Sequence, residues 1–232
     1  MEPLVKYRHE LKYLCSAREL EILRCRLSAV MRLDSHTDAS GMYHIRSIYF
    51  DDLHNSSFTE NEDGVSPREK WRIRAYNCSN ASISLECKRK ENGMIQKKAC
   101  RLTMEQFQKL LSSEFVEPCG KNPPLLNRFT YLQQTRKIMP KVIVGYDRRP
   151  FVCHTGNVRV TFDTNIFSSP DIDSFFEKNI RCRPILRVGQ HLLEVKYDEY
   201  IPDHIYRTIQ MTDMQLTTFS KYYLCRKYSI DT

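Results

Sequence analysis

The sequence predicts an α+β fold in which about eight antiparallel strands close into a barrel that is covered by helices. Nearly every predicted strand has one ionic face and one apolar face, because alternate residues of a strand point to opposite sides. Several segments carry apolar residues at helical spacing and are suited to cover the apolar faces. Closure places the ionic faces in a shared lumen and removes exposed sheet edges, so the barrel would enclose a charged tunnel.

The composition indicates one soluble domain with an anionic partner. The chain has 232 residues, of which 41% are hydrophobic and 28% are charged, so it is long enough for one substantial core. No linker or internal repeat divides it, and we expect a single domain over residues 1–232. The formal net charge of +8 suits nucleic acid, anionic lipid or a phosphate-rich ligand, and does not choose among them.

The nine cysteines contain no Cys-x-x-Cys pair, which argues against a zinc site built on close pairs. A disulfide framework is also not expected in a chain of this size, and reduced thiols point to the cytoplasm. The sequence has no apolar leader segment and no apolar run of transmembrane length, although a membrane partner remains open.

A basic hairpin organises the chain. Residues 68–76 and 82–90 read as two strands joined by a polar turn. In the first strand, four cations fall at every second residue: Arg68, Lys70, Arg72 and Arg74. Like charges on one face repel each other unless an anion lies among them, so the hairpin indicates a wall for a polyanion. A solvated basic surface is the alternative that this hairpin alone leaves open.

The remaining elements follow in order along the chain. Further strands are expected at residues 5–14, 43–51, 94–102, 141–149, 158–163 and 192–198. Helices are expected at residues 16–32, 103–111, 125–136, near 172–176, and in two pieces within 203–228. Two of them begin with a capping box, formed by Ser16 with Glu19 and by Thr103 with Gln106.

The predicted lumen combines the ionic faces of these strands. Its expected residues are Arg8, Glu10, Lys12, Arg46, Lys70, Arg72, Arg74, Glu86, Lys88, Arg159, Glu194 and Lys196. So many cations in one interior are costly unless a polyanion or solvent fills it.

The order of motifs resembles a known family. Arg8-His9-Glu10-Leu11-Lys12 is similar to the Glu-x-Glu-x-Lys signature of triphosphate tunnel metalloenzymes, and the whole chain resembles the VTC-type polyphosphate polymerase domain in its bacterial stand-alone form. The motifs that carry this second resemblance are residues 45–51, Arg68-x-Lys70-x-Arg72-x-Arg74, Leu85-Glu86-x-Lys88, Tyr146-Asp147-Arg148, Val158-Arg159-x-Thr161-x-Asp163, Leu193-Glu194-x-Lys196 and Ser220-Lys221-Tyr222.

The resemblance implies transfer of the γ-phosphoryl group of ATP to a growing polyphosphate chain. It implies phosphate binding by Lys12, Arg46, Lys70, Arg72, Arg74, Lys88, Arg148, Arg159, Lys196, Ser220 and Lys221. It implies a catalytic set of Arg72, Arg74, Lys88, Arg159 and Glu194. Mn²⁺ or Mg²⁺ is the implied cofactor, with Glu194 as its ligand. Glu10 and Glu86 are further candidates, although for both of them an ion pair with a neighbouring lumen cation is the favoured role.

Two other functions remain open. A metal-dependent inorganic or nucleoside triphosphatase has the same fold, but Arg8 stands where such hydrolases carry a glutamate. A non-catalytic module that binds polyphosphate or inositol phosphates would show salt-sensitive binding without turnover. ATP, polyphosphate, pyrophosphate and triphosphate are therefore the expected ligands. RNA is not expected, because the basic faces hold almost no aromatic residues for stacking.

Overall fold

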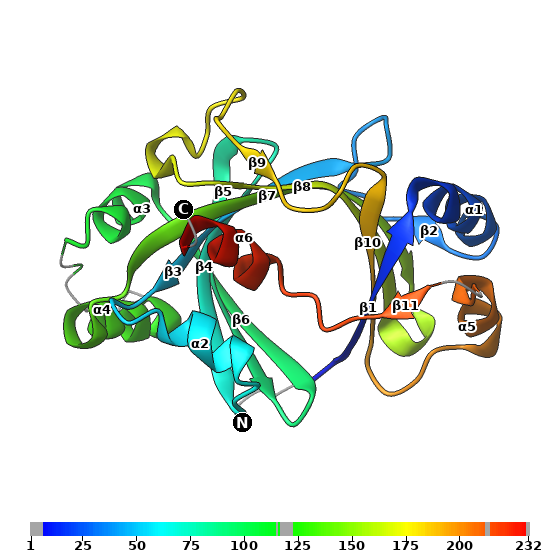
Figure 1. The fold of residues 1–232 in the computed structure, drawn as a ribbon, viewed down its shortest axis with the longest axis horizontal. Helices are drawn as coiled ribbons and strands as arrows, with labels where there is room; N and C mark the ends of the chain where they lie inside the picture. The colour runs from blue at the N-terminus through cyan, green and yellow to red at the C-terminus, as the bar shows by residue number, and fades with distance from the viewer. Residues whose placement is uncertain (1–6, 115, 117–122, 212–213, 231–232) are drawn as a thin grey trace.

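The computed structural model describes residues 7–114, 116, 123–211 and 214–230. It shows an α+β fold built on one antiparallel sheet of eleven strands. The sheet curves around a concave side, and most helices lie against its outer side (Figure 1). The prediction of an antiparallel sheet with helices is confirmed.

Eight strands have eight or more residues and correspond to those expected from the sequence. They are β1 (His9–Ser16), β3 (Tyr43–Asp51), β4 (Arg68–Tyr76), β5 (Ser79–Glu91), β6 (Met94–Leu102), β7 (Met139–Cys153), β8 (Val158–Ser169) and β10 (Gln190–Tyr197). Three two-residue strands were not expected: β2 (Arg32–Leu33), β9 (Arg183–Pro184) and β11 (Gln215–Leu216). Residues 5–6 of the first predicted strand lie outside the described residues.

The prediction of a closed barrel is wrong. The strand order runs β11-β1-β10-β8-β7-β3-β4-β5-β6 and leaves two free ends. Closure of the barrel would require β6 to pair with the free edge of β1, but β11 pairs with this edge at Tyr13 and Leu14. Among the described residues, β6 pairs with the chain before β1 at one isolated bridge, where Arg8 and Ile95 exchange backbone hydrogen bonds of 3.0 and 3.1 Å. The sheet is therefore a deep curve that does not close into a barrel: in the described part of the chain, its β6 edge meets the segment before β1 at this bridge.

The six α-helices of the described residues are α1 (Ala17–Ser28), α2 (Ser56–Glu62), α3 (Met104–Leu111), α4 (Pro124–Arg136), α5 (Asp203–Ile209) and α6 (Lys221–Ile230). Four of them, α1, α3, α4 and α5, contribute to the apolar cores on the outer face, whereas α2 packs on α6 at the concave side. Both predicted capping boxes are present at the starts of α1 and α3. The helix α1 ends at Ser28 rather than near Arg32, which belongs to β2. Within the described part of the chain, no helix has the length and apolar character needed to cross a membrane.

Two apolar cores lie on the outer side of the sheet. One contains Trp71 and Ile73 of β4 together with Phe129 of α4. The other contains Val195 of β10 and Leu23 of α1. The apolar faces of the strands point outward to the helices, as the alternation of residue types predicts.

A third core lies on the concave side and was not expected. It joins Tyr49 of β3 and Tyr146 of β7 to Tyr222 of α6. The helix α6 lies across the concave side of the sheet (Figure 1). The interior is therefore apolar and filled at one end, and the ionic residues are confined to the remaining part.

Candidate active site

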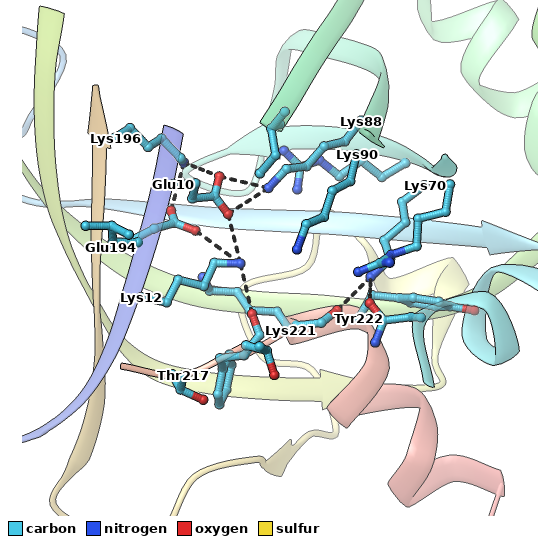
Figure 2. A pocket seen from close by; sticks show the side chains of 18 of the residues that line it. Glu10, Lys12, Lys70, Lys88, Lys90, Glu194, Lys196, Thr217, Lys221 and Tyr222 are labelled. Atoms are coloured by element: carbon cyan, nitrogen blue, oxygen red, sulfur yellow. Dashed lines mark hydrogen bonds and ion pairs between the residues drawn. The ribbon is translucent and has the colours of Figure 1, made fainter. Parts of the chain in front are cut away.

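A cavity of about 340 Å³ opens on the concave side. It is lined by strands β1, β3, β4, β5, β7 and β10 and by the segment from Leu216 to Tyr222. Two glutamates, Glu10 and Glu194, line it together with ten cations: Lys12, Arg68, Lys70, Arg72, Arg74, Lys88, Lys90, Arg148, Lys196 and Lys221. Figure 2 shows both glutamates and the lysines of this set converging from separate elements.

The basic hairpin forms one wall of the cavity, as the sequence predicts. The strands β4 and β5 pair so that Lys70 lies opposite Lys88 and Arg72 lies opposite Glu86. Because alternate residues share a face, Lys70, Arg72 and Arg74 all enter the cavity while Trp71 enters the outer core.

Short hydrogen bonds fix the orientation of the two hairpin arginines. Arg72 donates to Glu86 Oε2 at 2.8 and 2.6 Å and to the Tyr49 hydroxyl at 2.8 Å. Arg74 donates to the Ser47 hydroxyl at 3.1 Å, and also to the Tyr146 hydroxyl at 3.1 Å. Both guanidinium groups are thus oriented before any ligand binds, which favours bidentate recognition of phosphate.

A buried ionic network joins β7, β8, β10 and α6. Arg148 donates to both oxygens of Asp163 at 2.6 and 2.7 Å and to Glu194 at 3.0 Å. Lys221 at the start of α6 contacts Asp163 at 2.6 Å. Burial opposes ionisation of Asp163, but Arg148 and Lys221 outweigh it and lower the pKa of this carboxyl. The network fixes Arg148 at the cavity wall and anchors α6 to the sheet.

Two cavity glutamates are surrounded by lysines. Glu10 contacts Lys12 at 2.8 Å and Lys88 at 2.9 Å, and Glu194 contacts Lys196 at 2.8 Å (Figure 2). Burial raises the pKa of both carboxyls, but the nearby cations outweigh it and hold each pKa well below its usual value. Both glutamates are therefore anions that orient lysines.

The lysines outnumber these anions, and their pKa values reflect it. Burial lowers the pKa of Lys88 to about 7, and Glu10 offsets this only in part. Burial also lowers the pKa of Lys70 well below its usual value, and Lys12 and Lys88 lower it further by repulsion. The cavity without ligand is thus short of negative charge.

The sequence matches the family model of the VTC domain over residues 7–230. The chain belongs to the VTC domain family, within the triphosphate tunnel superfamily. No curated protein matches it significantly.

Solved structures with little sequence identity share the fold of this VTC domain. A candidate adenylyl cyclase from Hippeastrum, described as having a dominant triphosphatase activity, superposes with a TM-score of 0.55 at 13% identity, covering 96% of each chain. The PH1819 protein from Pyrococcus horikoshii gives a TM-score of 0.51 at 13% identity, covering 96% of this chain and 99% of the other.

The structure brings most of the predicted phosphate-binding residues of the VTC domain into the cavity. Those that line it are Lys12, Lys70, Arg72, Arg74, Lys88, Arg148, Lys196, Ser220 and Lys221. Of the three predicted metal ligands, Glu10 and Glu194 line it. Glu86 is buried behind Arg72 and also accepts from Lys97 at 3.1 Å, so it orients cations.

The placement of Arg46 in the lumen is wrong. Arg46 shares a strand face with Ile48, which belongs to the outer core. It is buried, and its guanidinium donates to backbone carbonyls of Ser174, Phe175, Glu177 and Lys178. Arg46 therefore fastens the segment after β8 to the outer side and does not line the cavity.

Arg159 also does not line the cavity. It contacts Asp34 and the Tyr43 hydroxyl, each at 2.8 Å. Arg8, which prompted the comparison with hydrolases, pairs with Asp198 at 2.8 Å and likewise lies outside the lining.

Several lining residues were absent from the predicted site. Arg68 and Lys90 lie opposite each other in the hairpin, and their position on the cationic face was the available signal. Tyr49, Tyr146 and Asn61 gave no such signal, because their contacts with cavity cations depend on the tertiary fold.

The cavity offers oxygen ligands of the kind that the expected divalent metal prefers, but too few of them to complete its coordination. Carboxylate oxygens such as those of Glu10 and Glu194 suit Mg²⁺ or Mn²⁺. However, the described residues contain no group of three or more His, Cys, Asp or Glu side chains that could hold a metal ion. A divalent cation would need phosphate oxygens of the substrate as further ligands, which is the usual mode for Mg²⁺.

Proposed function

We propose that this VTC domain is an ATP-dependent polyphosphate polymerase. The observation that carries the proposal is the convergence of ten lysines and arginines on one cavity, with Arg72, Arg74 and Arg148 already oriented. A polyanion of closely spaced phosphates matches this arrangement better than a ligand with a single charge.

Phosphoryl transfer requires positioning and charge neutralisation more than covalent participation of the protein. An oxygen of the terminal phosphate of the chain attacks the γ-phosphorus of ATP, one P–O bond forms, and the bond to ADP breaks with ADP leaving. The oriented forks of Arg72, Arg74 and Arg148 suit the phosphates of the donor, and the flexible lysines neutralise the added charge.

Mn²⁺ or Mg²⁺ bound with ATP would supply further neutralisation of the leaving phosphates. Glu194 would hold it, with Glu10 beside it, in exchange for part of their contacts with lysines. Arg159 and Glu86, placed in the expected site by resemblance, would act from outside the cavity by supporting its walls. The reduced cysteines suit a cytoplasmic enzyme.

The test is incubation of the purified protein with ATP and Mn²⁺ or Mg²⁺, with polymer resolved on a gel and free phosphate measured. We expect long polymer from the wild-type protein and loss of polymer in Arg74→Ala and Glu194→Ala. Lys98→Gln is the matched control, because Lys98 is an exposed cation outside the cavity lining. Phosphate released without polymer would refute the polymerase.

A triphosphatase is the second candidate. It is favoured by the fold shared with the Hippeastrum protein that is described as having a dominant triphosphatase activity. It would produce free phosphate from tripolyphosphate or ATP in the same assay. Binding of polyphosphate without either product would instead leave a non-catalytic polyphosphate or inositol phosphate module.

A further inference from the structure

Four cations of the cavity form no ion pair with an acid among the described residues: Arg74, which is buried against the Ser47 and Tyr146 hydroxyls, and three cations of the hairpin. Lys70 donates only to neutral oxygens, those of Asn61 and Ser220, the latter at 2.8 Å. Arg68 donates to the carbonyl of Val65 at 2.7 Å. Lys90 makes no hydrogen bond or ion pair with the described residues, and its ammonium group points into the cavity (Figure 2). We call Arg68, Lys70 and Lys90 the outer cation cluster.

The other cavity cations differ in their pairing. Arg72 pairs with Glu86, Arg148 with Asp163, and Lys88 with Glu10. Their acidic partners are all buried: Glu86 is 2% exposed, Asp163 is 0% exposed, and the side chain of Glu10 is 3% exposed. Apart from Arg74, which donates to two hydroxyls, these inner cations are thus paired with buried acids, whereas the outer cation cluster is not.

The outer cation cluster lies nearer to solvent than the inner arginines Arg74 and Arg148. Arg68, Lys70 and Lys90 are each half-buried, as Lys88 also is, while Arg74 and Arg148 are each 6% exposed. In the hairpin of β4 and β5, Arg68 lies opposite Lys90. Lys90 is close to Gly93 in the turn between β5 and β6, and Gly93 also lines the cavity. A ligand that extends from the inner arginines toward solvent on this side passes the outer cation cluster.

Electrostatics indicates that this cluster binds an anion. Burial lowers the pKa of Lys90, and repulsion by Arg68 lowers it further. Lys70 faces cations from three sides: Lys12 of β1, Lys88 and Lys90 of β5, and Arg68 of its own strand. Its neutral neighbours are Asn61 and Ser220, and the Tyr222 ring lies 5.8 Å from its nitrogen. Such a group is unfavourable until negative charge is added.

We propose that the outer cation cluster is an acceptor subsite, which binds the end of an inorganic polyphosphate chain separately from the nucleotide phosphates. This rests on the proposed polymerase function. Lysines are flexible point charges that suit a chain advancing by one phosphate per cycle, whereas the oriented inner arginines suit a donor held in one geometry. The acceptor must also extend into solvent as it grows, and the outer cation cluster lies on that side.

The test compares ligands that differ in length. Binding of pyrophosphate, of a long polyphosphate and of a non-hydrolysable ATP analogue is measured by calorimetry on the full chain. Lys90→Gln should weaken long polyphosphate by roughly tenfold or more and leave the other two ligands within about twofold. Arg68→Gln should behave alike, Lys98→Gln should change nothing, and thermal unfolding checks that each variant is folded.

Equal weakening of all three ligands, or unchanged binding of long polyphosphate, would overturn the acceptor subsite. A steady-state assay adds a second readout: in Lys90→Gln the KM for added polyphosphate primer should rise while the KM for ATP stays constant. If the wild-type protein makes no polymer, the proposed function fails, but the length-dependent difference in binding still decides whether the outer cation cluster holds a phosphate chain.

Discussion

Binding of a phosphate chain should transfer a proton to Lys88. The low-dielectric surroundings of this half-buried lysine lower its pKa to about 7, so at pH 8 only about one-tenth of it is charged before ligand binds. Phosphates placed beside it favour the ammonium form and return the pKa toward its ordinary value. Binding should therefore take up roughly 0.9 proton at Lys88 at pH 8, about 0.5 at pH 7 and about 0.1 at pH 6.

The sign of the pH dependence follows from this uptake. Because the complex holds more protons than the free protein, affinity falls as pH rises above about 7. If the ligand restores the ordinary pKa, the part of the affinity due to Lys88 falls roughly 50-fold between pH 7 and 9. Lys70, whose pKa burial also lowers, should add to the uptake in the same direction.

Calorimetry in two buffers with different ionisation heats measures the uptake directly. Polyphosphate is titrated into the protein at pH 6, 7 and 8, and Lys88→Gln is treated identically. The difference between the two proteins removes any titration of the ligand itself. An uptake at pH 8 that is the same in wild-type protein and Lys88→Gln would refute the reasoning, as would an uptake that grows toward pH 6.

Three further predictions concern individual side chains. Glu10→Gln removes a buried anion that pairs with several lysines, so it should lower the free energy of unfolding, measured in urea, by about 3–5 kcal/mol. Added polyphosphate should restore part of this stability. An unchanged urea midpoint would contradict the prediction. Arg46→Ala should lower the free energy of unfolding by about 2–4 kcal/mol, because it leaves backbone carbonyls unpaired, but it should keep the affinity for tripolyphosphate. Arg74→Ala should weaken that affinity at least tenfold. Similar affinities in the two variants would be inconsistent with the placement of Arg46 outside the cavity and of Arg74 inside it. Trp71→Ala should lower stability by about 3–5 kcal/mol in thermal or urea unfolding, and a smaller loss would mean that the outer core is loosely packed.

Local patterns in the sequence predicted the strands and one wall of the site. The alternation of cations in β4 determines which residues enter the cavity, because a period of two assigns every side chain of a strand to one face. The capping boxes at Ser16 and Thr103 were equally local, since donor and acceptor lie three residues apart. These features needed no knowledge of the tertiary fold.

Long-range contacts account for what the sequence did not predict. Closure failed because the two-residue strand β11 takes the edge of β1, and so short a strand gives no periodic signal. Arg159 is held by Asp34, a residue 125 positions away, and α6 enters the concave side through contacts such as that of Lys221 with Asp163. The alternation rule itself would have placed Arg46 beside Ile48 on the outer face, and its charge alone was a misleading guide.

The acidic residues of the cavity are therefore more informative than its cations. In a polyanion site built from cations alone, mutual repulsion would destabilise the folded protein before the ligand binds, so some of the cations need acidic partners within the protein. Glu10, Glu194 and Asp163 provide these partners, and each is placed to orient a cation at the wall. The uncompensated positive charge is concentrated in the outer cation cluster, and we expect this charge to supply much of the free energy of polyphosphate binding. Asn61→Asp would add a carboxylate beside Lys70 of this cluster. It should raise the free energy of unfolding of the ligand-free protein and weaken polyphosphate binding, because the new carboxylate neutralises the positive charge that the ligand would otherwise neutralise.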